Sequence, residues 1–257
     1  MTFTRRKTLG LGLAGLAGLG AASVMPFRAR AQPAGDSYDT DGGKITVSPI
    51  SHASFVMTVP GLVIYNDPVG GAGLYEGHPA PDLILITHEH GDHYDAETLA
   101  AIARDNTRLI TNPAVLGMLP EALKSKAAAI ANGESTDVGA VKIEAIPAYN
   151  TTEDRLKYHP KGRDNGYVLS VDARRVYIAG DTEDIPEMRA LKDIDIAFVP
   201  MNLPFTMDVD QASSAVAEFA PKFVYPYHYK GSDPEAFAAK VKAAGKEIEV
   251  VQGAWYD

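Results

Sequence analysis

The sequence predicts an α+β fold in which two mixed β-sheets pack face to face and helices cover their outer faces. Short apolar runs rich in branched residues follow one another closely in the first half of the chain, whereas strand and helix patterns alternate in the second half. With 257 residues, 46% of them hydrophobic, the chain can bury one sizeable core. We therefore expect a single globular domain.

The first half begins with three predicted strands. The runs ITVSPI, ASFVMTV and LVIYND start at Ile45, Ala53 and Leu62, and Pro60 and Gly61 form a turn between the last two. The preceding segment SYDTDGGK is interpreted as a polar lead-in. The later run DLILIT is short, apolar and rich in branched residues, which predicts a strand buried on both faces.

Shorter elements follow in the middle of the chain. Asp95 can cap a helix in which Leu99 and Ile102 share one face. The runs RLIT and VKIEAIP predict short strands around a small helix.

The second half alternates strands and helices. GYVLSVDARRVYIAGD predicts a hairpin that turns at residues 172–175, and DIAFVP, FVYPYH and IEVVQ predict three further strands. Asp208 and Gln211 are spaced as a capping box at the start of one helix. A second helix begins with Pro234 and ends at Gly245.

Residues 1–31 are predicted to be a signal peptide of the twin-arginine type. Arg5 and Arg6 precede a weakly apolar stretch rich in Gly, Ala and Leu, and Ala29 and Ala31 form an A-x-A cleavage site. The alternative is a transmembrane anchor, but roughly 17 apolar residues are short for a bilayer span. We therefore expect a periplasmic or secreted domain over residues 32–257, with no stable membrane insertion after cleavage.

Charge and cysteine content exclude several classes of function. Five of the 24 basic residues lie in the leader, which leaves 19 basic against 33 acidic residues and a net charge of −14. A domain this acidic repels phosphate backbones, so nucleic acid is not an expected partner. The chain has no cysteine, which excludes disulfides and thiolate metal ligands.

The segment THEHGDHYD directly after the DLILIT strand concentrates polar side chains that bind metals. His88 and His90 have the two-residue spacing that puts both imidazoles on one side of an extended chain, and Asp92 and His93 follow the turn at Gly91. Imidazole and carboxylate together suit a divalent ion such as zinc, with manganese or iron as alternatives. A capped turn with surface histidines is the other interpretation, and three histidines within six residues disfavour it.

The pattern H-x-H-x-D-H after an apolar strand, here ITHEHGDH, resembles the signature of the metallo-β-lactamase superfamily. The resemblance extends from SHASFVM through AGDT to YPYHYKG, and the chain is similar to the branch of ascorbate-6-phosphate lactonase and N-acylphosphatidylethanolamine phospholipase D. It implies an αββα four-layer sandwich with one or two metal ions at its edge. It does not imply cleavage of β-lactams.

The resemblance also implies a division of ligands between two divalent ions. Matched to the family pattern are His88 and His90 for the first ion, Asp92, His93 and His228 for the second, and Asp181 bridging both. From the residues alone, Asp181 could instead be a turn or cap residue, and His228 a structural histidine between tyrosines. Gly180 before Asp181 leaves room for close approach of the backbone.

One position departs from the family pattern. Many relatives have a third histidine for the first ion where this chain has Asn150, and an amide is a poor zinc ligand. His159, nine residues later, is the predicted replacement; the alternative is a histidine on a surface loop.

Three more residues have less definite assignments. Asp67 could accept the N–H of a ligating histidine or be a turn acid before Pro68. His52 resembles a position beside the active site and is a candidate for substrate binding, or else a hydrogen-bonded histidine near a strand. His78 is interpreted as a loop residue.

The predicted activity is metal-dependent hydrolysis of an ester, lactone or phosphodiester bond in a small molecule. Metal ions would generate a hydroxide at neutral pH, with Asp92 and Asp181 as catalytic carboxylates that orient it. The alternatives are an iron-dependent redox enzyme and a non-catalytic binding module. Lys157, Lys161 and Arg163 are compatible with an anionic substrate group, but a solvated loop is the preferred interpretation of these three residues. The oligomeric state stays open.

Overall fold

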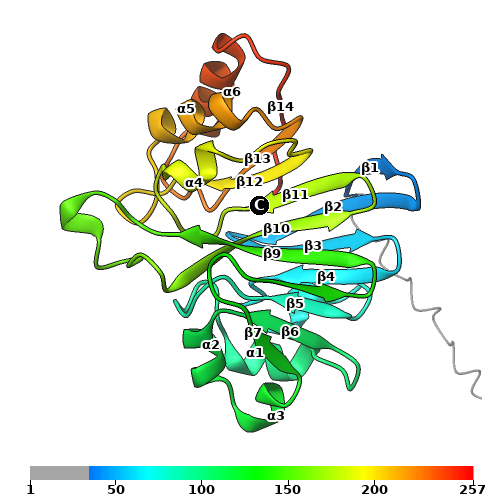
Figure 1. Cartoon of the computed structure of the whole chain (residues 1–257). Helices are drawn as coiled ribbons and strands as arrows, with labels where there is room; N and C mark the ends of the chain where they lie inside the picture. Colours follow the sequence, from blue (N-terminus) through cyan, green and yellow to red (C-terminus); the bar gives the residue numbers. More distant parts are fainter. Residues whose placement is uncertain (1–34, 257) are drawn as a thin grey trace, which may run out of the picture. The chain divides into compact units, whose positions relative to one another are not determined.

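The computed structural model describes residues 35–256, so the predicted leader lies outside the described residues. Within this range the strands form two seven-stranded sheets (Figure 1). The first sheet contains, in consecutive order, β1 (Asp36–Thr40), β2 (Gly43–Ser51), β3 (Ser54–Val59), β4 (Leu62–Asn66), β5 (Leu83–Leu85), β6 (Arg108–Thr111) and β7 (Ala127–Ala129).

The second sheet repeats this plan with different residues. It contains, again in consecutive order, β8 (Ser135–Val138), β9 (Val141–Ala148), β10 (Asp164–Val171), β11 (Arg174–Ile178), β12 (Ile196–Pro200), β13 (Phe223–Tyr227) and β14 (Glu249–Val250). Each sheet starts with antiparallel pairs and ends with parallel ones, from β4 onward in the first and from β11 onward in the second. Both sheets therefore have several strand carboxyl ends at one edge, where chemical groups can gather.

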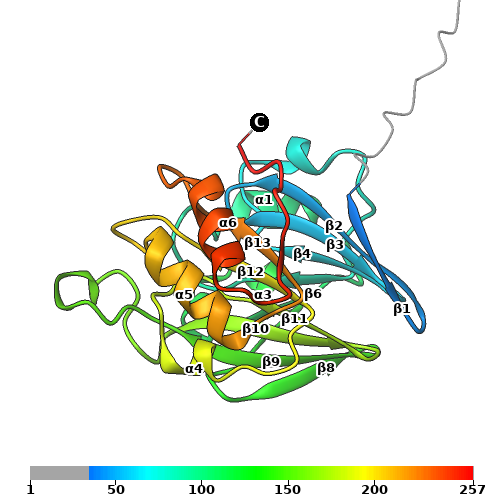
Figure 2. The ribbon, with the colours of Figure 1, turned by 90° about the horizontal axis from the view of Figure 1, so that it is seen from above.

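Helices cover the outer face of each sheet (Figures 1 and 2). On the first sheet lie α1 (Ala96–Ile102), α2 (Pro113–Met118) and α3 (Glu121–Lys124); on the second lie α4 (Pro186–Arg189), α5 (Val209–Phe219) and α6 (Pro234–Ala243). Two short 3₁₀ turns, η1 (Ala72–Tyr75) and η2 (Glu153–Arg155), complete the elements. Three apolar clusters separate the four layers, which confirms the predicted sandwich of two mixed sheets with outer helices.

The central cluster joins the inner faces of the two sheets. Phe55 of β3 stacks on Phe198 of β12 with ring centroids 4.2 Å apart, and the buried Trp255 packs edge-on against both rings. Aromatic contacts of this kind contribute beyond the area they bury. The core thus ties strands of both sheets to the C-terminal segment.

Several boundaries differ from the sequence-based prediction. The segment interpreted as a polar lead-in forms β1 and its turn, because Tyr38 packs on Phe223 and its hydroxyl bonds to that of Tyr225. Strands β7 and β8 were not predicted, the DLILIT strand ends at Leu85, and IEVVQ contributes only the two residues of β14. Strands β7, β8 and β14 depend on pairing with their neighbours for stability rather than on a pattern of their own.

The predicted helix caps are confirmed. The carboxylate of Asp95 accepts hydrogen bonds from the N–H groups of Glu97 and Thr98, and Asp208 and Gln211 exchange both bonds of a capping box. Among residues 35–256, every helix is too short or too polar to cross a bilayer.

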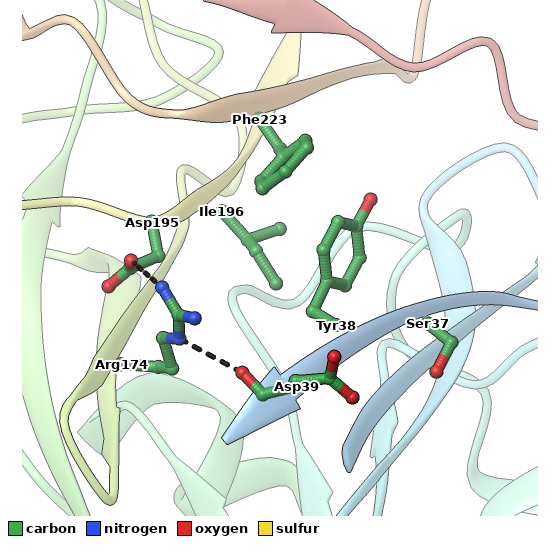
Figure 3. A pocket seen from close by; sticks show the side chains of 7 residues that line it. All are labelled: Ser37, Tyr38, Asp39, Arg174, Asp195, Ile196 and Phe223. Carbon is green, nitrogen blue, oxygen red and sulfur yellow. Dashed lines mark hydrogen bonds and ion pairs between the residues drawn. The ribbon is translucent and has the colours of Figure 1, made fainter. Parts of the chain in front are cut away.

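Asp195 links several strands at the edge where β12 begins (Figure 3). Its carboxylate accepts hydrogen bonds from Arg174 Nη1 (2.8 Å), Lys222 Nζ (2.7 Å) and the Arg175 N–H (2.9 Å). Arg174 also donates to the carbonyl of Asp39 on β1 in the other sheet. Burial opposes ionisation of Asp195, but the bonds from Lys222, Arg175 and Arg174 hold its pKa below the ordinary 3.8.

We predict that Asp195→Ala lowers the free energy of unfolding by about 2–4 kcal/mol at pH 7, because two cations and an N–H lose their buried partner. A carboxyl whose pKa is lowered by folding stabilises above its unfolded pKa, and this contribution disappears as the pH falls through the folded value. The difference between variant and parent should therefore shrink below about pH 4.

Urea denaturation at pH 7 and at acidic pH measures both effects. Asp137→Ala, which removes an exposed carboxyl of β8, is the matched control. A loss as small as that of the control at pH 7 would contradict the linking role of Asp195.

Candidate metal centre

The predicted ligands come from separate segments that meet where the parallel strands end. His88, His90, Asp92 and His93 follow β5, whereas Asp181 and His228 follow β11 and β13. His159 lies in the loop between β9 and β10. The cavity of Figure 3 lies at the opposite, amino-terminal end of β12 and is separate from this centre.

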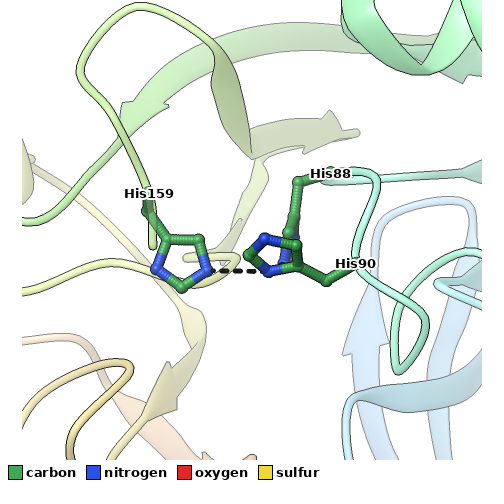
Figure 4. A group of neighbouring side chains, drawn as sticks. All are labelled: His88, His90 and His159. Atoms are coloured by element: carbon green, nitrogen blue, oxygen red, sulfur yellow. Dashed lines mark hydrogen bonds between the residues drawn. The ribbon is translucent and has the colours of Figure 1, made fainter. Parts of the chain in front are cut away.

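Three imidazoles form a first group, drawn in Figure 4. The Nδ1 atom of His90 lies 3.1 Å from Nε2 of His88 and 3.3 Å from Nε2 of His159. The nitrogens of all three rings therefore converge on one point, as they do in a three-histidine metal site.

Asp181 stands between this group and a second one. Its carboxylate oxygens lie 3.5 Å from Nε2 of His159 and 3.9 Å from Nε2 of His88 on the first side. On the other side they lie 3.3 Å from Nε2 of both His93 and His228. The two groups therefore share the Asp181 carboxylate. Within the second group, His228 Nε2 is also 3.4 Å from Asp92 Oδ2.

The buried atoms at the centre lack ordinary hydrogen-bond partners. Among the described residues, His93 Nε2, Asp181 Oδ1 and His228 Nε2 are buried without a hydrogen bond of acceptable geometry. Such orphans are costly and rare unless another group satisfies them. Imidazole nitrogens and carboxylate oxygens are the ligands that zinc and similar divalent ions take, so the residues fit the predicted metals.

The protonation states of the buried side chains also fit a metal site. Burial lowers the pKa of His88 and His90, and lowers that of His159 to about 4, so these rings are neutral at pH 7 and their lone pairs are available. Burial opposes ionisation of Asp181, yet the rings of His228 and His93 hold its pKa well below the usual range.

His93 lies between two carboxylates. Burial disfavours a charged ring, but Asp181 and Asp67 raise the pKa of His93 well above its ordinary value. The two carboxylates thus favour positive charge at His93. A divalent ion bound there would provide this charge in place of a proton on the ring.

Asp67 supports this arrangement from behind. It accepts hydrogen bonds from the N–H and the hydroxyl of Thr87, both at 2.7 Å, and its Oδ2 lies 2.8 Å from His93 Nδ1. The predicted contact to a histidine of the cluster is therefore present, and it leaves Nε2 of His93 facing Asp181.

A close backbone approach sets the position of Asp181. Gly180 has φ +65°, and a Cβ atom there would lie 2.7 Å from the carbonyl oxygen of Asn165. Only glycine fits both the left-handed backbone and this contact, as the sequence suggested.

Asn150 and His159 occupy distinct places. His159 is fully buried, so it is not a histidine on a surface loop. Asn150 Oδ1 lies 3.2 Å from His159 Nδ1, while its amide group donates to the carbonyls of Arg155 and Phe205. Asn150 therefore lies behind the His159 ring and orients it, and His159 takes the place in the first group.

His52 lies next to the second group. Its Nε2 is 3.3 Å from Asp92 Oδ2, and its ring centroid is 3.8 Å from that of His228. His52, Asp92 and His228 form a trio whose nitrogen and oxygen atoms all lie within 4.8 Å of one another. His78 lies in a loop, as interpreted from the sequence, and belongs to none of these groups of the described chain.

Sequence reasoning missed two parts of the site. Tyr158 and Phe205 line a cavity of about 300 Å³ together with His90, Asp92, His159 and Asp181. Tyr256 lies 2.7 Å from His52 through its hydroxyl. Tyr158 could have been noticed as the neighbour of His159, but Phe205 and Tyr256 reach the site only through the tertiary fold.

Comparison with known proteins agrees with this geometry. Residues 46–228 match the family described as the β-lactamase superfamily domain. A UPF0173 metal-dependent hydrolase of Pyrococcus furiosus is 30% identical over 221 residues, which are 80% of this chain and 95% of that protein.

Two solved structures extend the comparison. The crystal structure of a protein named as a metal-dependent hydrolase from Parabacteroides distasonis is 44% identical, covers 86% of this chain and 98% of its own, and has a TM-score of 0.77. A metallo hydrolase from Ignicoccus hospitalis is 25% identical, covers 81% of this chain and 95% of its own, and has a TM-score of 0.67. The chain therefore belongs to the metallo-β-lactamase superfamily, among its metal-dependent hydrolases.

Proposed function

We propose that this protein is a binuclear metal-dependent hydrolase, most suited to zinc, that cleaves an ester or lactone bond in a small molecule. The observation that carries the proposal is the Asp181 carboxylate, which lies within 3.9 Å of imidazoles on both of its sides. A carboxylate in this position can bridge two ions held by the two groups.

Each of the two groups would hold one ion. His88, His90 and His159 would hold the first ion, whereas Asp92, His93 and His228 would hold the second. When bound, such ions supply a hydrolytic water of lowered pKa and polarise the scissile bond. Manganese and iron also accept these ligands, so metal identity needs measurement.

The two catalytic carboxylates differ in exposure. Asp181 is buried and contacts imidazoles on both sides. Its role would be to neutralise part of the charge of the two ions and to fix their positions. Asp92 has about half of its side chain exposed and lines the cavity. The nearby rings of His228 and His52 outweigh burial and hold the pKa of Asp92 low, so this ionised carboxylate can orient a water molecule by accepting its hydrogen bond.

The cavity favours a neutral, apolar substrate group. Opposite the polar groups, the rings of Tyr158 and Phe205 lie 4.9 Å apart and form an aromatic wall. On the flanking loop, Arg163 is paired with Glu89 and Asp164, and Lys161 with Glu187. Because Lys161 and Arg163 are already paired with carboxylates, an ester or lactone with an apolar substituent is favoured over a phosphodiester, which has a full negative charge.

Export and partners complete the proposal. The leader over residues 1–31 would direct the folded domain to the periplasm through the twin-arginine pathway. The net charge of −14 on residues 32–257 supports a small-molecule substrate rather than a nucleic acid.

We predict that Asp181→Ala loses metal and activity together, with hydrolysis reduced by more than about 100-fold, since the shared ligand contributes more than an outer hydrogen-bond partner. Metal analysis is paired with a panel of p-nitrophenyl esters, lactones and bis(p-nitrophenyl) phosphate. Asp137→Ala is the control, and circular dichroism checks the fold. Full activity with normal metal content would refute bridging, and iron with oxygen consumption would favour the redox alternative.

His159→Ala should lower occupancy of the first site by removing one of its three imidazoles, so that the purified protein retains about one ion in place of two. Competition with a chelator measures the loss as weaker binding of one equivalent. His78→Ala, the loop histidine, should bind metal like the parent. Unchanged stoichiometry in His159→Ala would show that His159 is not a ligand.

Phe205→Ala should reduce selectivity for apolar substrates while metal content stays unchanged. In the parent, kcat/KM for p-nitrophenyl esters should rise by up to about fourfold for each methylene that the wall buries. In the variant this rise should flatten. Met118→Ala, which removes an exposed side chain of α2, is the control. An equal slope in parent and Phe205→Ala would show that the wall does not contact the substrate.

A further inference from the structure

The C-terminal segment reaches the candidate centre from outside the region matched to the family, which ends at residue 228. Trp255 is buried, with its ring 5.8 Å from that of Tyr227 in the central core. Its carbonyl accepts a hydrogen bond from the N–H of His52 at 3.2 Å. This anchor puts Tyr256 beside His52.

His52 is held in an unusual backbone conformation. Its φ of +53° is left-handed, which costs free energy for a residue with a Cβ and is often found at functional sites. Its N–H donates to Trp255, and its carbonyl accepts from the N–H of His228 at 3.0 Å. The turn between β2 and β3 is thus fixed on one side by the C-terminal segment and on the other by a proposed ligand.

The direction of the hydrogen bonds defines the tautomer of His52. The backbone N–H of Lys230 can only donate, and it does so to the Tyr256 hydroxyl oxygen at 3.1 Å. This bond alone leaves open the direction of the 2.7 Å contact between the hydroxyl and His52 Nδ1, because a hydroxyl oxygen has two lone pairs. The Asp92 carboxylate can only accept, and its Oδ2 lies 3.3 Å from His52 Nε2, so the proton of His52 is on Nε2 and Nδ1 accepts from the Tyr256 hydroxyl. A neutral imidazole that accepts at Nδ1 carries its proton at Nε2.

The Nε2–H group then points at the carboxylate of Asp92, where the Nε2–Oδ2 distance is 3.3 Å. A protonated Nε2 cannot ligate an ion, so this tautomer excludes His52 as a third ligand beside Asp92 and His228. It makes His52 a hydrogen-bond donor that orients a ligating carboxylate, a common role for groups behind metal ligands.

We propose that Tyr256 is a positioning residue of the metal centre: its hydroxyl holds His52 as the Nε2–H tautomer, and His52 in turn orients Asp92 toward the second ion. The inference rests on the proposed binuclear function for its last step only. The tautomer is a property of the polypeptide and can be tested without metal.

The first test is spectroscopic. Long-range ¹H–¹⁵N spectra of the metal-free and zinc-loaded protein should show His52 as the Nε2–H tautomer, and Tyr256→Phe should convert it to a mixture of tautomers. The variant keeps the ring and its packing, so its thermal stability should stay close to that of the parent. Tyr94→Phe, which removes a hydroxyl bonded to the Met118 carbonyl, is the matched control.

The second test measures affinity. Chelator competition should show that Tyr256→Phe weakens the second zinc equivalent by about tenfold and leaves the first unchanged. His52→Asn retains a residue that tolerates the left-handed backbone but removes the ring. If Tyr256 acts through His52, adding Tyr256→Phe to His52→Asn should have no further effect on zinc affinity.

Each outcome is decisive. A proton on Nδ1 of His52 in the parent, or an unchanged tautomer in Tyr256→Phe, would overturn the positioning role. Additive effects of the two substitutions on zinc affinity would also overturn it. If the parent binds a single zinc ion, the binuclear function fails, and the metal-free spectra still decide whether Tyr256 sets the tautomer.

Discussion

The buried Asp181 carboxylate among imidazoles is the constraint on which the rest of the site depends. The anion is 2% exposed, one of its oxygens has no hydrogen bond, and the rings of His88 and His159 beside it resist protonation. Asp67 adds a second buried carboxylate behind His93. Two buried carboxylates this close together need compensating positive charge, so the arrangement is stable when cations occupy it.

Turns with strained, left-handed backbone conformations position several of these side chains. His52, Asp67 and His228 all have left-handed φ values, of +53°, +40° and +47°, and each follows a strand. Every such residue costs about 1–3 kcal/mol, so the surrounding structure must over-determine the turn. It does so with the hydrogen bonds of Asp67 to Thr87 and those that tie His52 to Trp255 and His228. The aromatic core between the sheets fixes the strands that the turns connect.

The sequence was most informative where local pattern and function coincide. The apolar strand before His88, the glycine before Asp181 and the two carboxylate caps are local signals, and the structure contains all of them. Strand β1 was missed because its signal is a single tyrosine that packs on β13, and β7 is three alanines stabilised by pairing with β6. The choice between Asn150 and His159 depended on which way a loop folds back. No residue spacing could show that Asn150 lies behind the ring.

The loop after β12 shows how substrate choice and metal binding can be separated within one site. The ring of Phe205 lines the cavity, whereas its backbone carbonyl lies 3.1 Å from His159 Nδ1 and accepts a bond from the Asn150 amide. What residue 205 contributes to the support of the His159 imidazole thus comes from its main chain, which every residue type provides. The side chain at the same position is free to change the shape and polarity of the wall. A substitution there alters what the cavity accepts and leaves the orientation of His159 intact. The shape of the cavity wall and the orientation of His159 can therefore vary independently at residue 205 of this chain.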